Sequence, residues 1–114
     1  MIDISHKLTD RGTLIFTLNG ELRIASSEEG KRQINSTISD MKAKNVVLDL
    51  SNLTFLDSAG IAVFISAYKN LTVDGGRIAL CGLEGHSKTI IEIASLEKII
   101  EVYATLDEAL EALS

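Results

Sequence analysis

A small hydroxyl stands at the junction of a predicted strand and a predicted helix, in the stretch Leu56-Asp57-Ser58-Ala59-Gly60. The apolar run at 46–50 is typical of an inner strand, and apolar residues recur over 61–71 at the spacing of one helical face. Ser58 is therefore expected in the first turn of a helix, beside backbone N–H groups that have no acceptor within the helix. Because those donors and the helix dipole favour negative charge, the position suits a phosphate. Ser58 is either a plain helix cap or a switch.

The simpler interpretation is that Asp57 or Ser58 caps the helix, since both residue types are preferred there and contribute about 1 kcal/mol. Two features indicate that this turn has a role beyond capping the helix. Ala59 and Gly60 are small and leave backbone donors uncovered. A glycine in the first turn also costs roughly 1 kcal/mol relative to alanine. We therefore expect the backbone N–H groups of this turn to be accessible to an approaching group.

Two strands followed by alternating helices and strands surround this turn. The strands are predicted at 2–8, 13–18, 46–50, 77–82 and 99–103. The turn at 10–12 joins the first two as a hairpin, and residues 19–22 leave the second strand as a loop. The first helix is expected to begin with a capping box of Ser26 and Glu29 and to end at Asn45. Helices are also expected from Ser58 to the turn at 74–76, over 87–96, and after a second capping box of Thr105 and Glu108.

The inward residues of the helix over 87–96 are expected to be Ile90, Ile93 and Ala94. The whole alternation predicts an α/β fold, with a mixed β-sheet flanked by about four α-helices in one domain over residues 1–114.

Composition limits the classes of partner. The net charge of −5 disfavours direct binding to nucleic acid or to an anionic membrane surface. No apolar stretch approaches the length needed for membrane insertion, and the first residues lack the apolar core of a signal peptide. The single cysteine, Cys81, lies in an apolar run and is expected to be buried in a reducing, cytoplasmic protein. Exposed edge strands predict a monomer or a weak dimer.

Two segments resemble the STAS-domain signature of bacterial anti-sigma factor antagonists, namely Val47-Leu48-Asp49-Leu50-Ser51 and Phe55-Leu56-Asp57-Ser58-Ala59-Gly60. The resemblance covers almost the whole chain, including residues 20–22, 75–76 and 107–110. It implies a STAS fold and a regulatory binding protein rather than an enzyme. The unphosphorylated form would bind an anti-sigma factor that is also a serine kinase, and so release a sigma factor for transcription. Phosphorylation would weaken that binding, and a phosphatase would reverse it.

By the same resemblance, Ser58 matches the phosphoacceptor. Asp57, Ala59 and Gly60 match the rest of a partner-facing turn, and Glu21 and Leu22 match a second contact loop. This chain has Arg23 where the family commonly carries an acidic residue. Because like charges on facing surfaces repel, Arg23 is expected to change which partner is tolerated.

Other functions have weaker support. A serine hydrolase of the G-x-S-x-G type requires glycine where Leu56 stands, and its base would be His6, in an edge strand, or His86, a surface or capping residue. The sequence has no nucleotide-binding glycine pattern and no cluster of metal ligands, so no cofactor is expected. The alternative that stays open is a STAS interaction module without phosphorylation, in a stress-sensing or membrane transport complex.

Overall fold

The computed structural model describes residues 2–113, which form one mixed sheet of six strands and four α-helices. The strands are β1 (Ile2–Leu8), β2 (Thr13–Leu22), β3 (Asn45–Asp49), β4 (Leu53–Leu56), β5 (Arg77–Cys81) and β6 (Glu101–Tyr103). The helices are α1 (Ile24–Met41), α2 (Ser58–Thr72), α3 (Gly85–Ile93) and α4 (Leu106–Leu113), with a 3-10 helix, η1, at Leu96–Lys98. This architecture confirms the predicted α/β fold.

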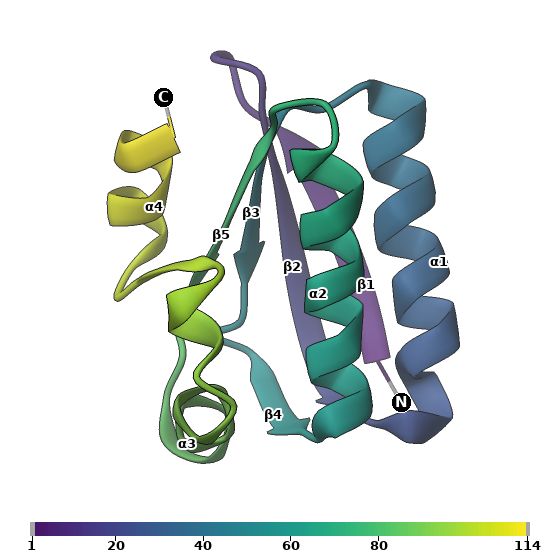
Figure 1. Ribbon diagram of the computed structural model, residues 1–114, viewed down its shortest axis with the longest axis vertical. Coiled ribbons are helices and arrows are strands. Elements are labelled where there is room, and N and C mark those ends of the chain that lie inside the picture. Colours follow the sequence, from purple (N-terminus) through teal and green to yellow (C-terminus); the bar gives the residue numbers. More distant parts are fainter. Residues whose placement is uncertain (1, 114) are drawn as a thin grey trace.

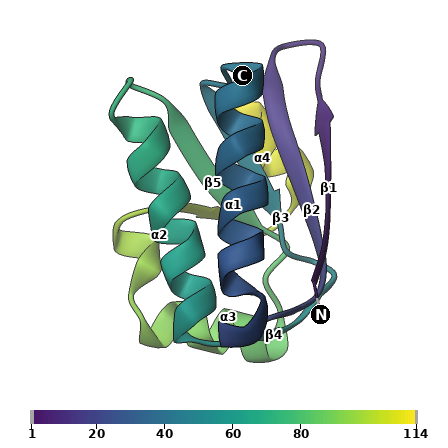
Figure 2. The same ribbon diagram turned by 90° about the vertical axis from the view of Figure 1, so that its right-hand side faces the viewer.

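The sheet runs in the order β1-β2-β3-β5-β6, and β4 pairs with the far end of β2. Only the β1–β2 hairpin is antiparallel among the pairs of residues 2–113. Helices α1 and α2 lie side by side on one face of the sheet, and α4 covers the other face (Figures 1 and 2). The central strands are therefore buried on both faces, which explains their continuous apolar runs.

The apolar residues of alternate positions divide between these two layers. Leu14, Phe16 and Leu18 of β2 face the α1–α2 layer and are almost completely buried. Val47, Ala79 and Cys81 face α4, where they contact Ala109 and Leu113. Burial raises the pKa of the Cys81 thiol to about 12. The prediction that Cys81 is a buried small hydrophobe is confirmed.

Residues 19–22 are not the loop that the sequence predicts. They continue β2, where Gly20 pairs with Ile2 on one side and with Leu53 on the other. The register with β4 shifts between Gly20 and Glu21, and Gly20 has a positive φ of 107°. A local irregularity of this kind bends a strand without ending it. Strand pairing on both sides thus overrides the turn signal of the asparagine and glycine.

Strand β4 was not among the predicted elements. It has four residues and pairs in parallel with the end of β2, at Glu21 and Leu22. It follows the inner strand β3 through the turn at Ser51–Asn52 and leads directly into Asp57. The junction before Ser58 is therefore formed by this short strand rather than by the run at 46–50.

Helix α1 begins and ends earlier than expected. Its N-cap is Arg23, whose N–H donates to the Oγ of Ser26 at 3.2 Å, so Ser26 lies within the first turn and is not the cap. The side chain of Glu29 instead accepts hydrogen bonds from Arg32 and Gln33, one turn further along the helix. Lys42 adopts a left-handed conformation with φ 53° and ends α1, so that Asn45 opens β3.

The helix predicted over 87–96 begins and ends earlier in the structure, as α3 (Gly85–Ile93). α3 ends at Ile93, and Ser95 has a positive φ of 55° before η1 begins. Ile91 is buried on α3, whereas Ile93 is 75% exposed and Ala94 is exposed, so the prediction that these two face inward is wrong. The predicted cap at Thr105 is confirmed, because its Oγ1 accepts the N–H of Glu108 at 3.2 Å.

Candidate functional site

Ser58 is the first residue of α2, and its side chain is exposed. The residue that caps the helix is Asp57, whose Oδ1 accepts the N–H of Gly60 at 3.1 Å. The carbonyl of Asp57 accepts the N–H of Ile61 at 3.1 Å. Of the two candidate caps, Asp57 therefore serves as the cap, and the Ser58 hydroxyl is accessible from solvent at the positive end of the helix dipole.

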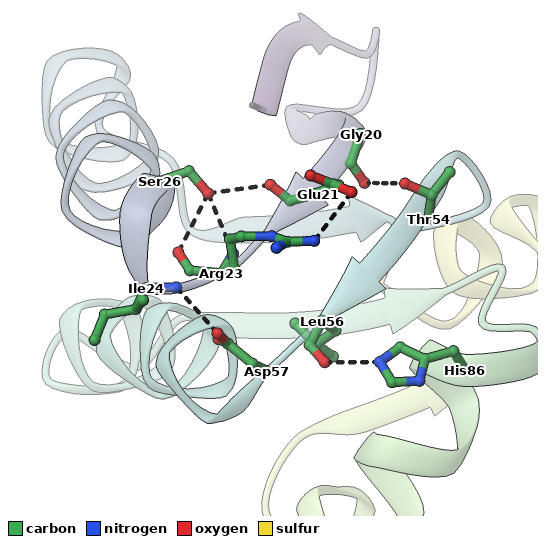
Figure 3. Close-up of polar contacts among 9 residues, drawn as sticks. All are labelled: Gly20, Glu21, Arg23, Ile24, Ser26, Thr54, Leu56, Asp57 and His86. Carbon is green, nitrogen blue, oxygen red and sulfur yellow. Dashed lines mark hydrogen bonds and ion pairs between the residues drawn. The ribbon is translucent and has the colours of Figure 1, made fainter.

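The carboxylate of Asp57 also reaches a second helix. Its Oδ2 accepts the N–H of Ile24, the first residue of α1, at 3.0 Å (Figure 3). One side chain thus accepts a backbone N–H from the first turn of both α1 and α2, and the positive ends of the two helix dipoles meet beside Ser58. Asp57 and Ile24 are 33 residues apart in the sequence, so no local pattern could have predicted this contact.

Gly60 lies beneath the surface instead of exposing the backbone. A Cβ at this position would lie 2.9 Å from the carbonyl oxygen of Leu22 and would also clash with the side chain of Leu56. Its N–H is already engaged by Asp57. The expectation that Gly60 keeps backbone donors accessible is therefore wrong, since close packing against β2 and β4 is what requires glycine.

The remaining predicted contact residues differ in exposure. Leu22 is fully buried under the turn, and Ala59 is half-buried beside Ser58. Glu21 and Arg23 are half-buried at the end of β2 and form an ion pair, with 3.0 Å between Nη2 of Arg23 and Oε2 of Glu21. The structure thus brings all seven predicted residues into one region, with Leu22 and Gly60 as its support. Arg23 directly precedes Ile24, whose N–H donates to the Asp57 carboxylate (Figure 3).

Two aromatic side chains extend this region, and sequence reasoning missed their role. The guanidinium of Arg23 lies 4.3 Å from the centroid of the Phe55 ring, and that ring stacks on His86 at 4.8 Å. The Nε2 of His86 lies 3.0 Å from the carbonyl oxygen of Leu56 (Figure 3). We call Arg23, Phe55 and His86 the Arg23 stack. His86 comes from α3, and its distance in sequence from the other two left no signal.

The Arg23 stack bears on the chemistry available to Ser58. The ring of His86 stacks on Phe55, and its Nε2 contacts the Leu56 carbonyl. His86 is therefore not positioned as a general base for the Ser58 hydroxyl. His6 lies in β1, against Phe16. Among residues 2–113, no group of three or more metal-ligating side chains could hold a metal ion. No helix in the same range is long and apolar enough to cross a membrane.

Comparison with known proteins gives a consistent result. Residues 6–109 match the model of the STAS domain family. The anti-sigma F factor antagonist of Paenibacillus polymyxa is 33% identical over 93 residues, which cover 82% of this chain and 80% of that protein. An anti-sigma factor antagonist from Mycobacterium paratuberculosis superposes with a TM-score of 0.90 at 25% identity, covering 99% of this chain and 94% of the other.

A second similar structure shares the fold at lower identity. The Bacillus cell fate determinant SpoIIAA, solved in its phosphorylated form, has a TM-score of 0.74 at 20% identity. The superposition covers 98% of this chain and 100% of the SpoIIAA chain.

Proposed function

Because this chain belongs to the STAS-domain family of anti-sigma factor antagonists, we propose that it is a regulatory binding protein controlled at Ser58. The unphosphorylated form binds an anti-sigma factor with serine kinase activity and so releases a sigma factor. Phosphorylation of Ser58 weakens this binding, and a phosphatase restores it. The observation that carries the proposal is the exposed Ser58 hydroxyl beside the shared N-termini of α1 and α2.

A phosphoryl group at Ser58 is compatible with this fold. It adds about −1.5 to −2 charges at neutral pH, and helix N-termini stabilise negative charge. The first turn of α2 still offers the N–H groups of Ser58 and Ala59, which have no acceptor within the helix. The unphosphorylated and phosphorylated structures of SpoIIAA each share the fold of this chain with a TM-score of 0.74, which supports the expectation that modification leaves the scaffold intact.

The added charge is large enough to switch binding. Asp57 is adjacent and already negative, so phosphorylation makes this corner strongly anionic. A partner carboxylate about 4 Å from one added charge would experience roughly 4 kcal/mol of repulsion at an effective dielectric near 20. That energy corresponds to about a thousandfold loss of affinity. No rearrangement of the domain is needed for this effect.

The partner surface is centred on Ser58 and includes Asp57, Ala59, Glu21 and Arg23. Leu22 and Gly60 hold this surface in place from below, since both are buried. Arg23 adds a cation that an acidic partner group would meet favourably, although Glu21 compensates part of its charge. The aromatic rings of the Arg23 stack fix the guanidinium, which reduces the ordering needed on binding.

The direct test is phosphorylation by candidate anti-sigma factor kinases from the same genome. Each purified kinase is incubated with ATP and the full chain, and the modified residue is mapped by tandem mass spectrometry. We expect one phosphoryl group on Ser58. Ser58→Ala should abolish the modification, whereas the matched control Ser36→Ala should leave it unchanged, because Ser36 is an exposed helical serine on α1.

A kinase-type anti-sigma factor that binds the chain stably but leaves Ser58 unmodified in the presence of ATP would contradict the switch. That result would instead favour the alternative of a STAS interaction module that works without phosphorylation, in a stress-sensing or membrane transport complex.

A further inference from the structure

The sheet ends at β6, and within residues 2–113 no strand pairs with the outer side of β6. On its inner side, β6 pairs in parallel with β5 through Glu101, Val102 and Tyr103. A strand at the end of a sheet presents backbone N–H and C=O groups that can pair with another extended chain. The side chains beside β6 determine which extended chain can pair with it.

A hollow lies on each side of this edge. The hollow next to α3 and η1 has a volume of about 500 Å³, and the hollow next to α4 is shallower and more open. Val102, Tyr103 and Ala104 line both, so they form the ridge between the two hollows. Because successive residues of a strand point to opposite faces, a strand added to β6 would send its side chains alternately into one hollow and the other.

The lining of the hollows indicates which side chains fit. Leu83 and Ile91 supply apolar surface in the hollow next to α3. Its exposed charged residues are three glutamates and one lysine, namely Glu84, Glu92, Glu97 and Lys88. The hollow next to α4 combines the apolar Ala112 with the exposed Glu108. Long cationic side chains match this surface, because their methylene stems contact apolar groups while their charged ends meet the carboxylates.

The ridge is held rigidly against its neighbours. The Nε of Arg77 donates to Oε2 of Glu101 at 3.0 Å, and the Tyr103 hydroxyl donates to Oε1 of Glu101 at 2.7 Å. The Nη1 of Arg77 also donates to the carbonyl of Ala112 in α4 at 3.1 Å. These contacts join β5, β6 and α4, so an incoming segment meets an edge that is already ordered.

We propose that the open edge of β6 binds an extended basic segment of a partner protein by strand addition. Backbone hydrogen bonds align the segment along β6. Its lysine or arginine side chains at alternate positions enter the acidic hollow next to α3, and the side chains between them enter the hollow next to α4. The net charge of −5 and the glutamates beside β6 disfavour a second copy of this chain as the occupant. This proposal is independent of the phosphorylation of Ser58.

The probe is a fluorescein-labelled peptide of alternating lysine and valine, titrated with the full-length chain. Fluorescence anisotropy should show saturable binding, and the backbone amide resonances of residues 101–104 should shift in two-dimensional NMR spectra. The same peptide with N-methyl groups on alternate backbone nitrogens keeps its charge but loses the N–H donors that strand addition needs. Its binding should be lost.

A charge-reversed variant tests the role of the acidic residues. Glu92→Lys combined with Glu97→Lys changes two exposed side chains beside the hollow and should weaken peptide binding roughly tenfold. The matched control Glu28→Lys, at an exposed position on α1, should change the affinity by less than about twofold.

Three results would overturn the proposal, and the first two use the unaltered chain. The first is equal binding of the N-methylated peptide, or no saturable binding of either peptide. The second is self-association of the chain alone that shifts the amides of residues 101–104 on dilution, since a second copy would then occupy the edge. The third is an equal loss of affinity for the peptide in the charge-reversed variant and in its control.

Discussion

Replacing Asp57 with alanine removes a side-chain acceptor from the first turns of two helices with one substitution. The lost contacts are those from Oδ1 to the Gly60 N–H, at 3.1 Å, and from Oδ2 to the Ile24 N–H, at 3.0 Å. Removing a helix cap costs about 1 kcal/mol, so Asp57→Ala should lower the free energy of unfolding by about 2 kcal/mol. Urea unfolding followed by circular dichroism should show this as a midpoint lower by about 1 M. Asp57→Asn keeps one side-chain acceptor and should lose about half as much.

Thr105→Ala is the matched control, because Thr105 caps a single helix through the N–H of Glu108. Thr105→Ala should lower the free energy of unfolding by about 1 kcal/mol. Amide hydrogen exchange provides a second measurement, since Asp57→Ala should speed exchange at Ile24 as well as at Gly60. The reasoning is refuted if Asp57→Ala destabilises the protein no more than Thr105→Ala, or if exchange at Ile24 is unchanged.

Three further results are expected. Gly60→Ala should destabilise the protein by about 1–3 kcal/mol in urea unfolding, because the new methyl group meets the Leu22 carbonyl; an unchanged midpoint would refute the packing role. Cys81, with a pKa of about 12, should react with a thiol reagent at pH 8 about a thousandfold more slowly in the folded than in the unfolded chain; rapid labelling without unfolding would contradict its burial. Hydrogen bonding to Arg77 lowers the pKa of the Glu101 carboxyl in the folded protein. The ionised carboxylate therefore stabilises the fold at a pH above the pKa of the unfolded chain, and this stabilisation is lost as the pH falls through the pKa of the folded chain. Stability should therefore decrease below about pH 4.5, and Glu101→Gln should reduce the slope in pH-dependent denaturation; an identical slope in the variant would show that the pair contributes nothing.

The position of Ser58 could be predicted because the signals are local. A capping residue, a small-residue turn and an amphipathic stripe follow one another within a few positions, and each depends only on near neighbours. The same holds for the cap at Thr105. The central strands were found for a similar reason, since burial on both faces gives them uninterrupted apolar runs.

The contacts that hold the site together depend on residues far apart in sequence. The bond from Asp57 to Ile24 fixes where α1 begins, so the local capping pattern of Ser26 and Glu29 misplaced that end. Residues 19–22 have the composition of a turn, yet pairing with β1 and β4 holds them in a strand. The stacking of His86 on Phe55 likewise follows from the packing of α3 against β4, which no periodicity reveals.

The affinity of the anti-sigma factor partner for the two forms of this chain tests the central claim most directly. The full-length chain is prepared with serine and with phosphoserine at position 58, and each is titrated calorimetrically against the kinase-type anti-sigma factor that phosphorylates it. We expect the phosphorylated form to bind about a thousandfold more weakly while its circular dichroism spectrum stays the same. Equal affinities of the two forms would contradict control of binding at Ser58.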